Sequence, residues 1–228
     1  MMKKLWIRGL CAPLILLLAV TSHADGKSLV AGECAGCHAI SAPAEAVADR
    51  GLAPPLYFAG NKFRRDWLVQ WLQAPTRIRP AGYDLNNHVV SSPEGDAINE
   101  ESLVAHQTLS EAQANEAADF LMSLQPFTNL LESAAYTPGN ISWRMGQLNF
   151  GKFNGCDSCH QDAADYGGVS GPELYTAWDR LQPGFIASFI KDPTLWQPDA
   201  LMPDTNLSDA VISKLANYLK VAAEEDAE

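Results

Sequence analysis

The sequence predicts an all-α protein built from two tandem, homologous helical units. The first observation is an internal repeat, because residues 53–80 align without a gap on residues 171–198 at a constant offset of 118. Apolar residues recur at helical spacing in both copies, and no long stretch alternates apolar and polar residues as a half-buried strand would. Self-similarity at a fixed offset is typical of repeated structural units.

The first 24 residues predict a cleaved signal peptide that takes no part in the fold. Three basic residues precede an apolar run from Leu10 to Val20, and Ser22-His23-Ala24 supplies small residues where a signal peptidase cuts. The run is shorter than the ~20 residues that span a bilayer. We expect cleavage before Asp25, a periplasmic location and no transmembrane segment in the mature chain.

The mature chain is strongly acidic. Loss of three cations with the signal peptide takes the formal charge from -11 to -14. Such a charge argues against nucleic acid or an anionic membrane surface as the partner, and it favours partners with basic patches. Cys11 is removed as well, which leaves four cysteines.

These four cysteines form two copies of a C-x-x-C-H run, Cys34 to His38 and Cys156 to His160. The pattern predicts covalent attachment of haem, with two thioether bonds from the cysteines and the histidine facing the iron. A zinc ribbon normally sets its cysteine pairs about 15–20 residues apart, whereas more than a hundred residues separate these pairs. Neither zinc nor a pair of disulfides explains a histidine after both pairs.

We therefore predict two covalently bound haem c groups as cofactors. The residues predicted to hold them are Cys34, Cys37, Cys156 and Cys159, with His38 and His160 as iron ligands.

Helices are predicted around each haem. An apolar stripe predicts a short helix before Pro75, and its repeat predicts one before Pro193. The stripes comprise Trp67, Leu68, Trp71 and Leu72, and then Phe185, Ile186, Phe189 and Ile190. A last helix is expected in each half, because residues 109–121 align on 207–219, and Ser110 to Gln113 suits a capping box. A further helix is expected from Ser142 to Phe153.

Gly146 in that helix is predicted to admit a closely crossing helix. The expected organisation is a signal peptide at 1–24, a first domain at 25–125, a linker at 126–141 that packs along the domain seam, and a second domain at 142–228.

The second half resembles the class I cytochromes c over nearly all of residues 142–221. The matching features are C-x-x-C-H, Gly171-Pro172, Asp192-Pro193, Met202-Pro203 and a final helix that ends in Asn217-Tyr218-Leu219. The doubled arrangement resembles the tandem-domain dihaem cytochromes of the bacterial periplasm. The resemblance implies two cytochrome c domains, each a few short helices wrapped around a covalently bound haem.

For the second haem the resemblance implies His160 and Met202 as iron ligands. The Pro172 carbonyl would accept a hydrogen bond from the other ring nitrogen of His160, which fixes the ring and tunes its basicity. Pro54 is the matching residue for His38.

The first half departs from this pattern at the sixth iron ligand. It carries 20 extra residues between Pro80 and Leu109 and lacks a Met-Pro. Imidazole is the commonest metal ligand in proteins, so His106, three residues before Leu109, is the favoured ligand. His88 inside the insertion is the alternative, and an open or water-bound iron is the third possibility.

The expected function is that of an electron carrier with no catalytic residue of its own. Methionine ligation raises a haem potential, so electrons would enter at the first haem and leave from the second. Soluble or membrane-attached redox proteins are the expected partners. The alternatives are a haem enzyme of the dihaem peroxidase kind, the cytochrome subunit of a dehydrogenase or oxidase, and a gas or redox sensor.

Overall fold

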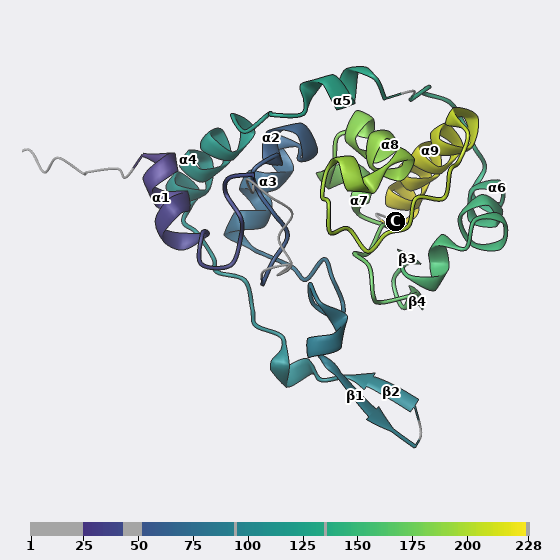
Figure 1. The fold of residues 1–228 in the computed structure, drawn as a ribbon, viewed down its shortest axis with the longest axis horizontal. Helices are drawn as coiled ribbons and strands as arrows, with labels where there is room; N and C mark the ends of the chain where they lie inside the picture. Colours follow the sequence, from purple (N-terminus) through teal and green to yellow (C-terminus); the bar gives the residue numbers. More distant parts are fainter. Residues whose placement is uncertain (1–24, 43–51, 94, 135, 227–228) are drawn as a thin grey trace, which may run out of the picture.

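The computed structural model describes residues 25–42, 52–93, 95–134 and 136–226. The predicted signal peptide therefore lies outside the described residues. Two helical bodies lie side by side, one from each half of the chain, and a connector runs across one side of both (Figure 1). Within the described part of the chain, no helix has the length and apolar character needed to cross a membrane.

The described part of the first half contains four α-helices and an excursion between the third and the fourth. The helices are α1 (Gly26–Glu33), α2 (Ala59–Lys62), α3 (Arg65–Gln73) and α4 (Glu111–Met122). Helix α3 ends before Pro75 as predicted, and Ser110 and Gln113 cap α4 reciprocally, which confirms the capping box. Helix α1 crosses α4 so closely that a Cβ on Gly26 would lie 1.9 Å from the Glu116 carbonyl oxygen.

The second half repeats this arrangement. Its elements are α6 (Trp143–Gln147), a π-helix (Leu148–Phe153), a 3₁₀ turn (Cys156–Ser158), α7 (Ala177–Arg180), α8 (Pro183–Lys191), a second 3₁₀ turn (Pro193–Leu195) and α9 (Asp209–Asp226). The close crossing predicted at Gly146 is confirmed, because a Cβ there would lie 2.0 Å from Cδ2 of Tyr218 on α9.

The all-α prediction is wrong. Strands β1 (Val89–Ser92) and β2 (Gly95–Ile98) form one small antiparallel sheet, and β3 (Gln161–Ala163) and β4 (Tyr166–Gly167) form another. The first sheet lies in the 20-residue insertion and projects from the body of the protein (Figure 1). The backbone amides and carbonyls of the inserted segment need hydrogen-bond partners. Pairing of its two strands in a hairpin supplies these partners within the segment itself. Strands of two to four residues are too short to show an alternating pattern.

The two halves meet across an approximate two-fold axis. Phe63 and Leu181, which are equivalent at the offset of 118, face each other in an antiparallel bridge. The Arg64 amide donates to the Arg180 carbonyl at 2.9 Å, and the Gln182 amide donates to the Lys62 carbonyl at 2.9 Å.

The side chains of Arg64 and Gln182 repeat this symmetry. Arg64 Nε donates to the carbonyls of Trp178 and Leu181 at 3.0 Å each. Gln182 Nε2 donates to the carbonyls of Gly60 and Phe63 at 2.8 and 3.0 Å. At the offset of 118, the acceptor carbonyls of Trp178 and Leu181 are equivalent to those of Gly60 and Phe63. The same backbone positions of both repeats therefore form the interface.

The connector packs against a core cluster that is formed mostly by the second half and includes two buried aromatic residues of the first half. It contains α5 (Thr128–Glu132), and Leu130, Leu131 and Tyr136 contact that core. The Tyr136 hydroxyl donates to Asn217 Oδ1 on α9 at 2.9 Å. The connector is therefore an ordered part of the structure.

Candidate functional site

One large cavity is lined by residues from both halves of the chain. Its volume is about 1180 Å³, and its walls are mostly apolar. Most ligand pockets measure about 300–1,000 Å³, so this cavity is large enough for an unusually large ligand or more than one. Cys34 and His38 line it from the first half, and Cys156, Cys159 and His160 line it from the second.

Each C-x-x-C-H run forms a tight turn that brings its histidine back over its first cysteine. The His38 amide donates to the Cys34 carbonyl at 3.0 Å, and the His160 amide donates to the Cys156 carbonyl at 3.0 Å. All four cysteines are free thiols. No three ligand-type side chains in the described ranges gather as a metal cluster; a porphyrin would need only one or two, since it supplies four nitrogens itself.

The two histidines are held in the same way. His38 Nδ1 lies 2.6 Å from the Pro54 carbonyl oxygen, and His160 Nδ1 lies 2.7 Å from the Pro172 carbonyl oxygen. A carbonyl can only accept, so Nδ1 carries the proton and Nε2 is the nitrogen left to bind a metal. Burial lowers the pKa of both rings, and the hydrogen bond that each ring donates to its proline carbonyl partly offsets this effect. The neutral imidazole favoured by burial is the form that ligates metals.

His106 faces His38 across the cavity edge. The two ring centres lie 6.2 Å apart, and His106 Nδ1 donates to the Gln107 carbonyl at 2.8 Å. Two imidazoles on opposite sides of one metal, with nitrogen–metal distances of about 2.0–2.1 Å, place their ring centres roughly 6 Å apart. The His106 side chain is exposed, but it lines the cavity and rests 4.5 Å from the Trp71 ring centre.

His88 lies in the insertion, outside the set of described residues that line the cavity. Its Nδ1 is 2.7 Å from Ser102 Oγ, and its ring packs against Gly82. At the second site, half-buried Met202 lines the cavity from the loop before α9. Of the two histidines considered for the first site, only His106 is brought to a C-x-x-C-H histidine.

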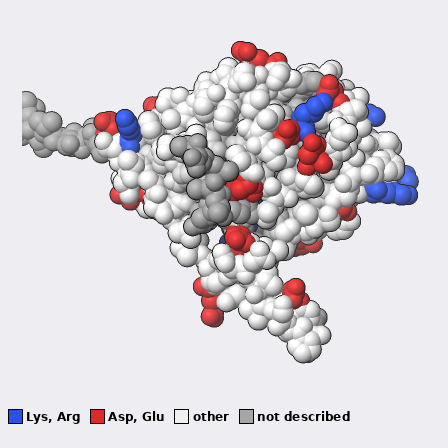
Figure 2. Space-filling view, in the orientation of Figure 1, with Lys and Arg blue, Asp and Glu red and all other residues white. Residues whose placement is uncertain are grey.

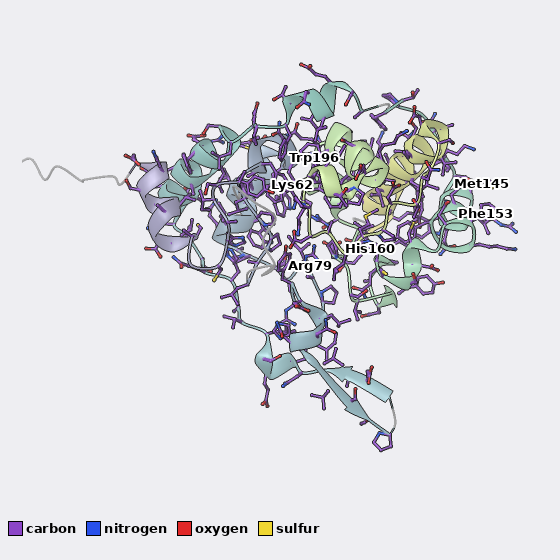
Figure 3. The ribbon with its side chains drawn as sticks, in the orientation of Figure 1. Lys62, Arg79, Met145, Phe153, His160 and Trp196 are labelled. Carbon is purple, nitrogen blue, oxygen red and sulfur yellow. The ribbon has the colours of Figure 1, made fainter. Side chains whose placement is uncertain are left out.

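Three cations that the sequence analysis did not single out gather at the seam beside the cavity. Lys62, Arg79 and Arg180 all line it, and Lys62, Arg79 and His160 lie between the two halves in Figure 3. The Lys62 ammonium lies 4.9 Å from the ring centre of Phe63. Arg180 forms a buried ion pair with Glu173 at 3.5 Å. The equivalence of Lys62 and Arg180 at the offset of 118 was the available signal.

Burial, with smaller contributions from the positive charges of Arg79 and Arg180, lowers the pKa of Lys62 to about 7. Buried positive charge calls for an anionic partner, which Arg180 has in Glu173 and which Lys62 lacks among the described residues. The carboxylates of haem would provide such a partner. A pair of haems therefore fits the seam cations, the apolar walls, the free cysteine pairs and the carbonyl-held histidines.

No protein-family model, curated protein or solved structure matches this chain. The resemblance to the class I cytochromes c therefore rests on the motifs of this sequence.

Proposed function

We propose that this chain is a periplasmic dihaem c-type cytochrome that carries single electrons between redox proteins. The observation that supports it most is the repeated geometry at one cavity, where each C-x-x-C-H histidine donates Nδ1–H to a proline carbonyl, at 2.6 Å in one half and 2.7 Å in the other. Each haem, when bound, supplies an iron that takes up and releases one electron.

The chain's own residues would hold and shield these groups. Cys34 and Cys37 would attach the first haem with His38 as ligand, and the second would be held by Cys156, Cys159 and His160. The apolar cavity walls would exclude water, and Lys62, which lines the cavity, would offset the negative charge of a haem carboxylate.

Different residues are proposed as sixth ligands, His106 in the first half and Met202 in the second. Support for His106 comes from the 6.2 Å separation of its ring from that of His38 and from its own carbonyl hydrogen bond. Because methionine ligation raises haem potential, the second site has the higher potential. Side-chain ligands on both irons leave no open position for substrate, which favours a carrier over an enzyme.

A redox titration of the protein made in a host that attaches c-type haem tests this function. We expect two separated one-electron waves and two distinct low-spin ferric EPR signals. Carbon monoxide should bind neither reduced iron of the wild-type protein. A wild-type protein that binds carbon monoxide at one haem would instead favour an enzyme or a sensor.

A further inference from the structure

A surface of mixed basic and apolar character lies on the second half, on the outer side of α6 and the π-helix. It is formed by Arg144, Met145, Lys152, Phe153 and Lys214, and we call it the α6 face. The side chains of Met145 and Phe153 are 48% and 60% exposed. Figure 3 shows both at the same outer edge of the molecule.

The π-helix explains why these residues share one side. Arg144 and Lys152 are eight positions apart, as are Met145 and Phe153. One α-turn of 3.6 residues followed by one wider π-turn of about 4.4 residues returns the chain to the same side after eight residues. Lys214 reaches the face from α9, where it lines with Met145 a small cleft of about 290 Å³.

Among the described residues, the cations of the α6 face have no acidic partner. Arg144, Lys152 and Lys214 are exposed and form no ion pair with any residue that the structure describes. Arg65, Lys191 and Lys220 elsewhere are each paired with a carboxylate. The chain as a whole has a formal charge of -11. The α6 face, with three cations that have no described acidic partner, is therefore opposite in charge to the protein as a whole. Basic side chains stand out at the α6 edge in Figure 2.

This face is joined directly to the second C-x-x-C-H loop. The Gly155 amide donates to the Gly151 carbonyl of the π-helix at 2.7 Å. A Cβ on Gly151 would lie 2.6 Å from Asp157 Oδ2, so the π-helix packs onto the loop itself. Phe153 is three residues from Cys156. A protein bound to the α6 face would therefore sit beside the second site.

We infer that the α6 face is the docking site of an acidic electron-accepting protein. The inference rests on the proposed function and names the chemistry of one partner. Methionine, aromatic and arginine side chains are enriched in protein interfaces, and unpaired cations attract an acidic surface and speed its arrival. In the transfer, one electron leaves the reduced protein and converts the acceptor from its oxidised to its reduced form.

Cross-linking gives a readout that does not depend on electron transfer. An acidic blue-copper protein serves as the probe, and a carbodiimide joins its carboxylates to lysine amines of the haem-loaded chain. We expect peptide mapping to find Lys152 and Lys214 in the cross-links. Lys27 on α1 and Lys220 on a different side of α9 are the controls. Cross-links at the control lysines alone would overturn the inference.

Kinetics with matched charge reversals test the same face. Arg144→Glu with Lys152→Glu should slow reduction of copper(II) in the probe about tenfold at low ionic strength, and added salt should shrink the difference. Lys27→Glu with Lys220→Glu changes the net charge equally and should leave the rate within about twofold of wild type. Equal effects of the two pairs would contradict the assignment.

Two further arms separate this inference from its rivals. Met145→Ala with Phe153→Ala keeps the charges and should weaken binding of the probe at both low and high salt; unchanged binding counts against the face. Phosphatidylglycerol vesicles test the membrane alternative. If the wild-type protein sediments with the vesicles, and if the charge reversals abolish this sedimentation but leave the probe kinetics unchanged, the partner of the face is a membrane and not a protein. A chain without a haem absorbance band would fail the proposed function before any of these measurements begins.

Discussion

The two halves share the C-x-x-C-H run and the proline that accepts from its histidine, and they differ in the residues on the opposite side of each candidate site. His38 with Pro54 and His160 with Pro172 have nearly the same hydrogen-bond geometry. Beyond Pro80 the first half runs through a projecting hairpin, whereas the second half goes through a short loop to Met202. The orienting contact is kept although 16 residues separate His38 from Pro54 and 12 separate His160 from Pro172, while the opposite side of each site is built from a loop that tolerates insertion.

The halves also differ at one pair of buried residues, and both members of the pair change together. The Tyr218 hydroxyl donates to buried Asp162 Oδ2 at 2.6 Å. The aligned residues of the first half are Phe120 and Ile40, both partly buried against its core. One half thus has a hydroxyl and a carboxylate, and the other has neither, as expected when a buried polar group needs its partner.

The largest effects are expected from the proposed sixth ligands. His106→Ala should open the first iron to carbon monoxide, while Met202→Ala should open the second and leave the first closed. Met202→His should lower the potential of the second haem alone by roughly 0.1–0.3 V, well within the ≈ 0.8 V range set by axial ligands. Spectroelectrochemistry with and without carbon monoxide measures both effects.

His88→Ala is the matched control for this comparison. Its ring contacts Ser102 and Gly82 outside the cavity lining, so the first iron should stay closed. If His88→Ala opens that iron and His106→Ala does not, the insertion itself provides the ligand.

Glycine substitutions at the two helix crossings come next in size. Gly26→Ala and Gly146→Ala would place a methyl group 1.9 Å from a carbonyl oxygen and 2.0 Å from a tyrosine ring. Overpacking of this kind costs about 1–3 kcal/mol or more of unfolding free energy. Gly32→Ala, also on α1, meets no atom within 4 Å and should stabilise the protein by up to about 1 kcal/mol. Urea titration measures all three, and a Gly26→Ala result like that of Gly32→Ala would contradict the close crossing.

The Tyr218–Asp162 pair should show non-additive effects. Tyr218→Phe leaves Asp162 with no partner for either carboxyl oxygen, because Oδ1 already lacks one among the described residues, and should cost about 1–3 kcal/mol. Adding Asp162→Ile gives the second half the same phenylalanine and isoleucine that the first half has at these positions, and it should recover most of this loss. Urea titrations of the single and double variants complete the cycle, and simple additivity would argue against the pairing.

This pair also predicts a pH dependence. Burial raises the pKa of Asp162, which the Tyr218 hydrogen bond partly offsets. A folded-state pKa above the unfolded value means that stability falls as pH rises through the raised pKa. Tyr218→Phe removes the offset, so its cost should be larger at about pH 7 than at about pH 4, where the unfolded carboxyl is half protonated. A cost independent of pH would show that Asp162 is not the source.

Effects of comparable size are expected from the hydrogen bonds at the seam. Arg64→Ala removes two hydrogen bonds from a charged donor and should cost about 2–3 kcal/mol, against about 1–2 kcal/mol for Gln182→Ala. Arg64→Gln introduces the glutamine that the second half has at the equivalent position, Gln182, and should recover most of the stability that Arg64→Ala loses. Urea unfolding followed by tryptophan fluorescence reports these values, and a full loss in Arg64→Gln would contradict the two-fold equivalence.

Much of the helical framework followed from local patterns in the sequence. Prolines ended α3 and α8, and Ser110 capped α4, because these signals act within one turn of the chain. Gly146 was predicted at a crossing because a missing side chain is visible in a sequence. The hairpin of the insertion was missed, although its pairing is local, because strands of four residues are too short to show a periodic pattern.

The candidate site divides in a similar way. The cysteines and proximal histidines follow from motif spacing, and the proline carbonyls follow from the resemblance. The sequence left His106 and His88 open, because ring proximity across 68 residues is a tertiary property. Lys62 and Arg180 were missed because burial of a cation is invisible until the two halves are placed together.

Denaturing mass spectrometry tests the central claim most directly. Protein made in a host that attaches c-type haem should show a chain of residues 25–228 that carries two covalent haem groups. Cys34→Ser with Cys37→Ser should remove one of them, and Cys156→Ser with Cys159→Ser should remove the other. A wild-type chain that carries one haem or none, or variants that each retain two, would contradict the account.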